Sequence, residues 1–470
     1  MSELFTLSAA VEITGASLYA KRQDLSEVSI RDAAVDSRKV TPGSLFIALK
    51  GDRTDGHLFL RDAESKGAAV MMVSGEFFDS VESAEALKAL RVPILIHKDP
   101  LRGLQQLAGA HVANFPELVR IGVTGSNGKT TTKEMLAAIL SEAAPTVKNR
   151  GNLNSEIGLP LAVLHIREQH RFGVFETGVN HPGEMDQMTD ILQPNCGVIT
   201  NVGTAHIGLL GSREGIAREK GRLFAALPAD GVGFYPESFE WIQLYRDLCR
   251  APLIPFGRGS TEGIEKVESL GLKGWSIRYE GLDLRLLLPG EHNLKNALAA
   301  IQVSRTLGAV PKHIKRGIES MELLGGRSQI IEGPVRIIHD GYNANAESVL
   351  AMFETLKECV RVDSLIVVLG AMGELGEETG PSHRKVGNGL AALNSRGAFL
   401  LGPETRSAYD EARRQGYRGE MMCTEDFDEL RDLVDRYVRP GDTVLLKGSR
   451  SMQLERLLPV LQNKFIQEKK

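Results

Sequence analysis

The fold of this chain is decided by one stretch of sequence, Leu118-Val119-Arg120-Ile121-Gly122-Val123-Thr124-Gly125-Ser126-Asn127-Gly128-Lys129-Thr130. The apolar run 118–123 predicts a buried strand, and apolar residues at helical spacing between Met135 and Leu140 predict a helix soon after the glycines. Gly125 and Gly128 let backbone N–H groups wrap a phosphate, while the helix N-terminus adds positive potential. We therefore expect a phosphate-binding loop between a strand and a helix.

Two side chains of this loop have the chemistry to handle a nucleotide. Lys129 would reach the β- and γ-phosphates, and the Thr130 hydroxyl would contact Mg²⁺. The strict pattern G-x-x-x-x-G-K-[ST] requires a glycine at position 123, where this chain has Val123. The match is thus to a shorter variant loop, and a glycine-rich turn capped by a surface lysine is the alternative.

The alternation of strand and helix continues on both sides of the loop. A mostly parallel sheet with helices on both faces is expected from this rhythm. The predicted strands are 45–49, 69–73, 93–97, 172–176, 197–201, 231–235, 335–339, 365–369, 398–401 and 443–446. The predicted helices are 58–66, 101–114, 292–307, 346–359 and 427–437, and residues 275–279 and 282–288 predict an antiparallel hairpin.

Composition excludes several classes of protein. The 470 residues suggest roughly three domains. A net charge of −4 and 6% aromatic residues argue against a nucleic-acid binder, so no nucleic-acid partner is expected. Neither an apolar run of about 20 residues nor a secretory signal is visible, so we expect no membrane insertion and a cytoplasmic location. The four scattered cysteines indicate neither a disulfide framework nor a zinc site.

Several polar residues follow predicted strands or share a helix face, and each has an ordinary alternative. Glu176 and His206 could hold a metal beside the phosphates, because ligands bind beyond the carboxyl ends of parallel strands. A solvated glutamate and a hydrogen-bonded histidine fit equally well. Lys220 could be a surface lysine, and Asn293 and Asn296 could cap a helix.

The third part of the chain offers two further candidates after strands. Asp340 precedes Gly341-Tyr342-Asn343-Ala344-Asn345, which could be an ordinary Asx-rich turn. The run Lys447-Gly448-Ser449-Arg450 could be a second anion site or a turn.

Taken together, these motifs resemble the Mur ligases, the ATP-dependent amide-bond ligases of peptidoglycan synthesis. The motifs that carry the resemblance are 124–130, Gly151-Asn152-Leu153-Asn154-Ser155, Glu176, 201–206, Lys220, His292-Asn293-x-x-Asn296, Gly326-Arg327 and 340–345. Within the family, the chain is most similar to the members that add D-alanyl-D-alanine to UDP-N-acetylmuramoyl-tripeptide. That closer likeness rests on the stretches Asp36-Ser37-Arg38 through Asp55-Gly56-His57, 340–345 and Lys447 through Met452.

The resemblance implies three α/β domains. A smaller N-terminal domain (1–98) would bind the UDP-sugar, and a central P-loop ATPase-like domain (99–325) with a mostly parallel sheet would bind ATP. A C-terminal Rossmann-like domain (326–470) would bind the incoming dipeptide. Joining the two substrates through an acyl phosphate would give ADP, phosphate and UDP-N-acetylmuramoyl-pentapeptide, and the enzyme is expected to act as a monomer.

The resemblance also assigns roles to individual residues. Catalytic roles fall to Lys129, Glu176, His206 and Lys220. ATP would be bound by Thr124, Gly125, Ser126, Asn127, Gly128, Lys129, Thr130, Thr131, Asn293, Asn296, Arg327 and Asp340. Substrates would be bound by Ser37, Arg38, Asp55, Gly56, His57, Asn152, Ser155, Tyr342, Asn343, Lys447, Ser449 and Arg450. Mg²⁺ would be held by Thr130, Glu176, His206 and, once carbamylated, Lys220.

Two residues depart from the family pattern. Ala346 stands where a proline is usual, which alters loop stiffness. Arg222 stands where a glutamate is common, which changes the charge expected near Lys220.

Four rival interpretations make different predictions. A diaminopimelate-adding relative would usually carry Asp-Asn-Pro-Arg in the third domain, and this run is missing from the sequence. A folylpolyglutamate synthase would lack a first domain like residues 1–98. A nucleotide-controlled switch would bind ATP without ligation, and a phosphotransferase would release a phosphorylated product.

Overall fold

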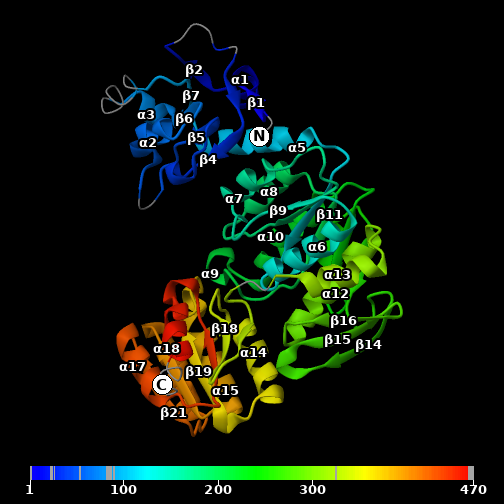
Figure 1. Ribbon diagram of the computed structural model, residues 1–470, viewed down its shortest axis with the longest axis vertical. Helices are drawn as coiled ribbons and strands as arrows, with labels where there is room; N and C mark the ends of the chain where they lie inside the picture. Colours follow the sequence, from blue (N-terminus) through cyan, green and yellow to red (C-terminus); the bar gives the residue numbers. More distant parts are fainter. Residues whose placement is uncertain are drawn as a thin grey trace.

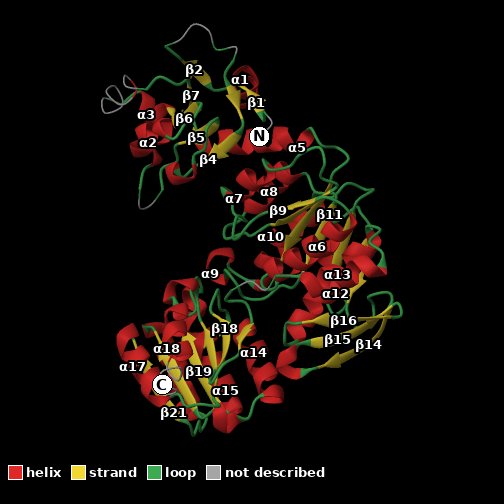
Figure 2. Ribbon diagram, in the orientation of Figure 1, coloured by secondary structure: helices red, strands yellow, loops and turns green. Residues whose placement is uncertain are grey.

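The computed structural model describes residues 3–21, 25, 27–51, 54–80, 87, 90–322 and 325–463. Three α/β units follow one another, with the first, in blue, at one end and the third, in yellow to red, at the other (Figure 1). Each unit has its own sheet with helices packed against it (Figure 2). The predicted α/β fold class is confirmed, whereas the exact domain boundaries stay a prediction. Among the described residues, no helix is long and apolar enough to cross a membrane.

The first unit is a small mixed sheet with short helices. Its strand order is β2 (Ser17–Tyr19), β7 (Ile94–His97), β6 (Val70–Ser74), β5 (Ser44–Ile47) and β4 (Asp32–Ala34), with only the β2–β7 pair antiparallel. A separate pair joins β1 (Phe5–Thr6) to β3 (Ser29–Ile30), and the helices include α1 (Leu7–Thr14), α2 (Leu60–Ser65) and α3 (Gly75–Phe78). The predicted helix 58–66 starts late, because Gly56–Phe59 forms a 3-10 turn whose His57 N–H is capped by the Asp55 carboxylate.

The central unit has a six-stranded, fully parallel sheet. Its order is β13 (Leu253–Phe256), β12 (Val232–Pro236), β11 (Cys196–Ile199), β8 (Val119–Thr124), β10 (Phe172–Glu176) and β9 (Thr146–Lys148). Consecutive residues of β10 face opposite sides: Val174 joins one core cluster and Phe175 the other. Burial on both faces explains why these strands are continuous apolar runs in the sequence.

Helices cover both faces of the central sheet. One face carries α6 (Lys129–Ala143), α12 (Glu291–Thr306) and α13 (Pro311–Ser320). The other carries α5 (Pro100–Ala113), α7 (Gly158–Val163), α8 (Glu184–Leu192), α10 (Arg213–Ala225) and α11 (Ile242–Leu248).

A small antiparallel sheet is appended to the central unit. It comprises β14 (Ile264–Ser269), β15 (Trp275–Tyr279) and β16 (Leu282–Leu286). The predicted hairpin is confirmed as β15 and β16. The third strand, β14, was not predicted, because most of its side chains are exposed and it carries no apolar alternation.

The third unit has a six-stranded sheet with one antiparallel edge. Its order is β17 (Gln329–Ile331), β18 (Arg336–Asp340), β22 (Thr443–Lys447), β19 (Leu365–Gly370), β20 (Gly397–Leu401) and β21 (Glu420–Thr424), and only β17 runs antiparallel. One face packs against α14 (Ala346–Cys359), α15 (Thr379–Leu393) and α16 (Arg406–Arg414). The other packs against α17 (Phe427–Tyr437) and α18 (Leu458–Asn463).

Candidate functional site

The loop between β8 and α6 is built around two glycines that no other residue could replace without strain. Gly125 and Gly128 have φ angles of +143° and +80°. A Cβ on Gly125 would lie 1.9 Å from Thr200 Oγ1, and one on Gly128 would lie 2.3 Å from Asn296 Oδ1. Val123, where the strict pattern has glycine, is instead a buried residue inside β8. The loop is therefore short and tightly enclosed, as a phosphate-binding turn requires.

Lys129 folds back over this loop. Its Nζ donates to the carbonyl of Gly125 at 2.8 Å and to that of Ser126 at 3.3 Å. Desolvation lowers the pKa of Lys129, although the nearby Glu176 carboxylate opposes the shift. The lysine thus occupies the space beside the loop where an anion would pair with it.

Glu176 ends β10 and points its buried carboxylate toward α6. Thr130 Oγ1 donates to Oε2 at 2.7 Å, and Asn154 Nδ2 donates to Oε1 at 2.6 Å. The alternative of a solvated glutamate is therefore wrong. A carboxylate and a hydroxyl beside a phosphate loop fit Mg²⁺, which proteins usually hold through one or two carboxylates together with phosphate oxygens.

His206 lines one cavity together with Lys129 and Glu176, but its present partner is a carboxylate of the third unit. Its Nδ1 lies 2.7 Å from Glu374 Oε2, and this contact holds the pKa of Glu374 below its usual range. Across the described residues, the structure contains no ready-made group of three or more His, Cys, Asp or Glu that could hold a metal. The predicted metal set is thus partly assembled, with Thr130 and Glu176 in direct contact.

Lys220 is fully buried on α10, which makes the surface-lysine alternative wrong. Its Nζ has no hydrogen-bond partner among the described atoms. Desolvation, and next the charge of Lys129, lower its pKa well below 10.5, while Glu219 and Glu176 oppose the shift. Such an amine loses its proton easily, and the neutral amine is the form that reacts with carbon dioxide. Arg222 lies half-exposed, with its Nε 3.6 Å from Asp186 Oδ2.

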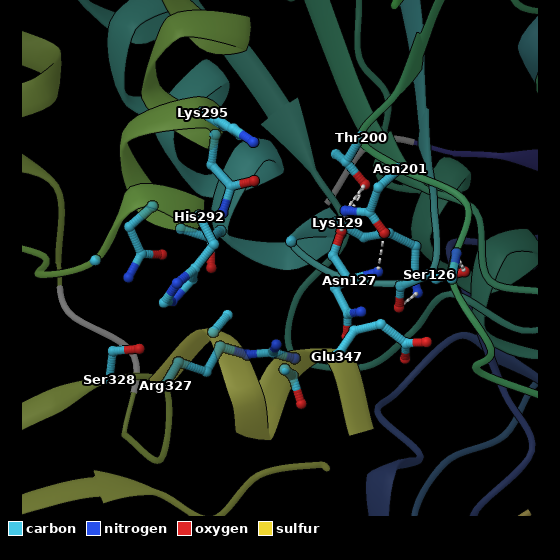
Figure 3. Close-up of a pocket in the computed structure, with 18 of the residues that line it drawn as sticks. Ser126, Asn127, Lys129, Thr200, Asn201, His292, Lys295, Arg327, Ser328 and Glu347 are labelled. Carbon is cyan, nitrogen blue, oxygen red and sulfur yellow. Dashed lines mark hydrogen bonds between the residues drawn. The ribbon is translucent and has the colours of Figure 1, made fainter. Parts of the chain in front are cut away.

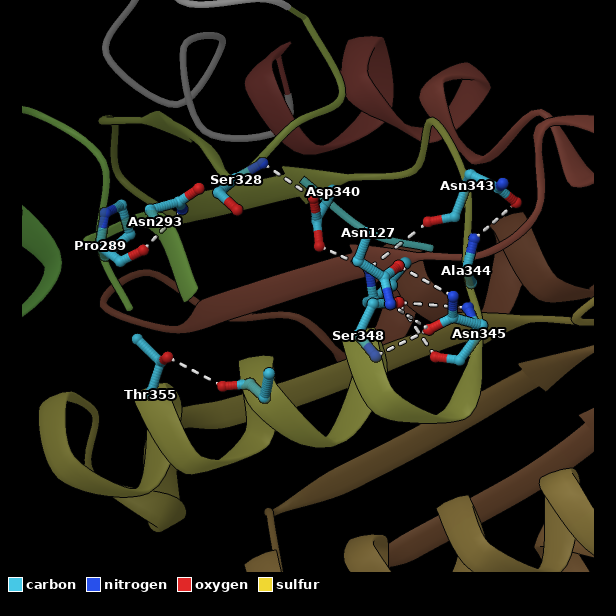
Figure 4. A network of polar contacts seen from close by, with 12 residues as sticks. Asn127, Pro289, Asn293, Ser328, Asp340, Asn343, Ala344, Asn345, Ser348 and Thr355 are labelled. Atoms are coloured by element: carbon cyan, nitrogen blue, oxygen red, sulfur yellow. Dashed lines mark hydrogen bonds and ion pairs between the residues drawn. The ribbon is translucent and has the colours of Figure 1, made fainter. Parts of the chain in front are cut away.

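A cluster on the third unit faces the phosphate loop. Asp340 Oδ1 accepts from the Ser328 N–H at 2.8 Å, and its Oδ2 lies 2.6 Å from Nζ of the buried Lys447. Lys447 also donates to the Asn343 carbonyl at 3.4 Å. The Asx-turn alternative does not account for these contacts, because the Asp340 carboxylate binds the backbone of Ser328 on another segment (Figure 4) and a buried cation.

Next to this cluster, Arg327 stacks its guanidinium over the Tyr342 ring, 4.0 Å from the centroid. The two side chains therefore form one flat, positively charged wall of the cavity.

Of the two asparagines of α12, Asn296 lies at the loop itself. Both are buried, and Asn296 Oδ1 lies against Gly128. Asn293 Nδ2 donates to the Pro289 carbonyl at 2.8 Å, which is not a helix cap: the N-cap of α12 is Gly290, and no side chain caps the helix there.

Direct contacts join the phosphate loop to the third unit. Asn127 and Asn345 exchange side-chain amide hydrogen bonds of 2.8 and 3.3 Å. Thr204 Oγ1 donates to both oxygens of Glu347, at 2.9 and 2.8 Å, and Glu347 reaches toward the loop from α14 (Figure 3). These cross-unit partners lie far apart in sequence, so the sequence reasoning assigned no role to Asn345, Glu347 or Glu374.

Asn201 is another residue for which no individual role was predicted. Its Oδ1 accepts from the Asn127 N–H at 3.0 Å, and its Nδ2 donates to the Asn127 carbonyl at 2.9 Å. Its side chain therefore fixes both backbone groups of one loop residue. Its position just after β11, at the carboxyl edge of the sheet, was the available signal.

One cavity of about 1170 Å³ collects most of the predicted residues. It opens between the central and third units and is lined from both. The predicted residues that line it are Ser126, Asn127, Gly128, Lys129, Thr130, Thr131, Asn152, Ser155, Glu176, His206, Asn293, Asn296, Arg327, Asp340, Tyr342, Asn343 and Lys447.

The other predicted residues lie outside the cavity lining. Ser449 Oγ accepts from the Gly373 N–H at 2.8 Å, and Arg450 pairs with Glu455. Thr124, Gly125 and Lys220 are also missing from the lining, and Thr124 and Lys220 are fully buried.

The predicted residues of the first unit do not line this cavity either. Asp55 Oδ1 lies 2.6 Å from Nδ1 of the buried His57, whose ring stacks on Phe77 with centroids 4.3 Å apart. Ser37 is buried and Gly56 packs against the backbone of Leu49. Arg38 is exposed and pairs with Asp36.

Three domain families match the chain. The Mur ligase family, catalytic domain, matches residues 30–112; the Mur ligase middle domain matches 123–304; and the Mur ligase, glutamate ligase domain, matches 326–450. The chain belongs to the Mur ligase family.

Comparison with individual proteins places the chain within that family. It is 38% identical over 428 residues to the UDP-N-acetylmuramoyl-tripeptide–D-alanyl-D-alanine ligase of Treponema pallidum, covering 91% of this chain and 92% of that protein. MurF from Acinetobacter baumannii superposes with a TM-score of 0.85 at 30% identity, covering 97% and 98%. MurF ligase from Thermotoga maritima in complex with ADP superposes with a TM-score of 0.78 at 26% sequence identity, covering 93% of this chain and 98% of that chain. The protein is a Mur ligase of the MurF type.

Proposed function

We propose that this protein joins D-alanyl-D-alanine to UDP-N-acetylmuramoyl-tripeptide at the expense of ATP, in the cytoplasmic synthesis of peptidoglycan precursors. The observation that carries the proposal is the cavity in which the phosphate loop of one unit faces the Asp340–Lys447 pair of the next. A site split between two units suits a reaction that must bring ATP together with two other substrates. The Treponema pallidum relative described above, whose name states this activity, supports it.

The proposed reaction has two steps, phosphorylation of the tripeptide carboxylate and attack by the amine of the dipeptide. A carboxylate oxygen of the tripeptide attacks the γ-phosphorus of ATP, the bond to the β-phosphate oxygen breaks, and ADP leaves. The amine of the dipeptide then attacks the acyl carbon and loses a proton, and the tetrahedral intermediate expels phosphate. No general base is assigned to this proton.

In the first step, Lys129 exchanges its hydrogen bonds to Gly125 and Ser126 for contacts to the phosphates. Negative charge spreads over the γ-phosphoryl oxygens during transfer, so a fixed cation stabilises the transition state more than the ground state. The loop N–H groups and the N-terminus of α6 add to this stabilisation. Asn293, Asn296, Arg327 and Asp340 would contact the rest of ATP.

The donor set at Glu176 fits a magnesium ion. Thr130, Glu176 and His206 would hold Mg²⁺, which when bound reduces the repulsion between carboxylate and phosphate. Because Glu374 engages Nδ1 of His206, Nε2 is the nitrogen that would bind the ion, and ion binding would be coupled to the junction between the units through this pair. Lys220, buried and easily deprotonated, would become a carbamate and so add a carboxylate group behind the site.

The substrates would bind on either side of this centre. Ser37, Arg38 and the Asp55–His57 turn would hold the UDP-sugar, and Asn152 and Ser155 would face the peptide. Tyr342, Asn343, Lys447, Ser449 and Arg450 would receive the dipeptide, whose carboxylate suits a cationic surface. Approach of the third unit would then exclude water from the acyl phosphate.

The decisive experiment measures ADP release from ATP and Mg²⁺ with both peptide substrates. We expect release only when UDP-N-acetylmuramoyl-tripeptide and D-alanyl-D-alanine are both present, together with the pentapeptide product in a mass spectrum. ATP binding without this dependence would instead indicate a nucleotide-controlled switch and refute the proposal. The monomeric state stays a prediction.

A further inference from the structure

A fully buried asparagine continues the sheet next to the phosphate loop. Backbone pairing of β9 with β10 ends at Lys148 and Val174. One residue further on, the side chain of Asn149 takes over: Oδ1 accepts from the Glu176 N–H at 3.0 Å, and Nδ2 donates to the Glu176 carbonyl at 3.1 Å. A side-chain amide carries the same donor and acceptor as a peptide group. Asn149 therefore extends the ladder by one step, to the residue whose carboxylate contacts Thr130.

The same amide also holds the loop that contacts this carboxylate from the other side. Asn149 Nδ2 donates to the Leu153 carbonyl at 2.7 Å. The next residue, Asn154, donates to Glu176 Oε1 at 2.6 Å, and its carbonyl accepts from the Gly178 N–H at 2.8 Å. One side chain thus fixes both the backbone of Glu176 and the path of residues 150–155.

Asn149 is itself anchored to the helix that begins at the phosphate loop. Nζ of the fully buried Lys133 donates to the Asn149 carbonyl at 2.8 Å and lies 2.9 Å from Glu134 Oε1. Lys133 follows Lys129 by four residues, one turn of α6. Neither Asn149 nor Lys133 lines the cavity, so both act through other residues.

We propose that Asn149, anchored by Lys133, is a positioning residue that sets the direction of the Glu176 carboxylate and the path of loop 150–155. Through them it determines how tightly the site holds the nucleotide with its metal ion. A carboxylate ligand is effective only when its support holds it to about 0.5 Å. The inference rests on the proposed function for the identity of the ligand, and on the hydrogen bonds alone for the positioning.

Asn149→Leu tests this role, because leucine has a similar size but neither donates nor accepts. A matched control is Asn195→Leu in the same sheet. Asn195 Oδ1 accepts from the Arg120 N–H at 2.8 Å and Nδ2 donates to the Leu118 carbonyl at 3.4 Å, at the end of the sheet away from the cavity. Both variants remove the hydrogen bonds of an asparagine amide to strand backbone. In Asn149→Leu they are lost at the end of the sheet next to the phosphate loop, and in Asn195→Leu at the opposite end.

Two measurements on the full chain decide the matter: the calorimetric affinity for ADP with Mg²⁺, and amide hydrogen exchange across residues 150–178. We expect Asn149→Leu to weaken the affinity at least tenfold and to speed exchange in this segment. Asn195→Leu should change the affinity less than twofold, although both variants melt at lower temperature. Equal affinities in the two variants, or unchanged exchange in Asn149→Leu, would overturn the inference.

Lys133→Met, which keeps the Asn149 amide, provides a second variant with its own criterion. We expect Lys133→Met to bind ADP with Mg²⁺ about threefold more weakly than the wild type, because Asn149 loses its anchor. If Asn149→Leu does not fold, this loss of affinity in Lys133→Met is the test. Wild-type affinity in Lys133→Met would then overturn the inference. Both measurements omit the peptide substrates, so a wild-type protein that binds ADP but forms no pentapeptide would refute the proposed function alone.

Discussion

Replacing Lys129 by methionine is the most direct test of the phosphate loop. The substitution keeps the aliphatic stem and removes only the ammonium group, whose present contacts are the carbonyls of Gly125 and Ser126. Because Ser126 lines the cavity, water can take over at least that contact in the variant. The folded protein should therefore tolerate the change better than the reaction does.

The two effects have different sizes. Loss of a hydrogen-bond donor aimed at developing charge costs about 2.7–4 kcal/mol, or about 10²–10³-fold in kcat. Loss of two neutral acceptor contacts costs at most about 1–3 kcal/mol. Removing a cation whose pKa is lowered by desolvation opposes that cost. At about 2–4 °C per kcal/mol, a unit of this size should lose only a few degrees in melting temperature.

The assay is ADP release at saturating substrates, with thermal unfolding measured on the same preparations. Lys295→Met is the matched control, because Lys295 lines the same cavity from α12 and its loss changes the net charge equally. We expect a change below threefold for the control. Turnover of Lys129→Met within tenfold of wild type, or an equal loss in the control, would refute the argument for a placed cation.

Three further changes have expected outcomes that simple measurements can check. Gly128→Ala places a Cβ 2.3 Å from Asn296 Oδ1 at a φ of +80°, so it should destabilise the protein by at least about 1–2 kcal/mol and weaken ADP binding tenfold or more, measured by thermal unfolding and calorimetry. The unmodified Lys220 binds its proton less tightly in the folded protein than in the unfolded chain, so unfolding takes up a proton and stability rises with pH up to about 10.5. Lys220→Met should raise stability at pH 7, flatten this rise in denaturant titrations and abolish ligation. An unchanged dependence of stability on pH in the variant would contradict the argument. The Arg38 guanidinium lowers the pKa of Asp36 to about 2, so the stability that this carboxylate contributes is fully present above pH 3.8 and is lost as the pH falls toward 2. In Arg38→Ala the pKa of Asp36 should return toward 3.8, as an NMR titration would show.

Most of the parallel core could be predicted from the sequence, because a strand buried on both faces is a continuous apolar run. The predicted strand at Phe172–Glu176 and the helices at Ala346–Cys359 and Phe427–Tyr437 have the bounds that the structure gives. Edge strands were missed for the opposite reason. Both β14 and β17 keep side chains exposed or half-buried, so their apolar pattern is too weak to read.

The candidate site was most readily predicted where a residue follows a strand or glycine-rich loop. Lys129 and Glu176 have that local signal. Burial of Lys220 had a signal that was not used: the apolar residues of α10 lie three or four positions before and after it, which places this lysine on the inward face of the helix. Contacts across the cavity, such as Thr204 with Glu347, depend on how two units meet, and sequence separation hides them.

The reciprocal amide pair between Asn127 and Asn345 has a consequence for the exchange of modules between relatives. Each amide both donates and accepts, so substituting one of them by aspartate leaves two acceptor oxygens facing each other and removes one of the two hydrogen bonds between the units. Asn345 also caps α14, so the same atoms determine where that helix begins. A chimaera that takes its nucleotide-binding half from one relative and its C-terminal half from another would therefore have to inherit both asparagines as a pair.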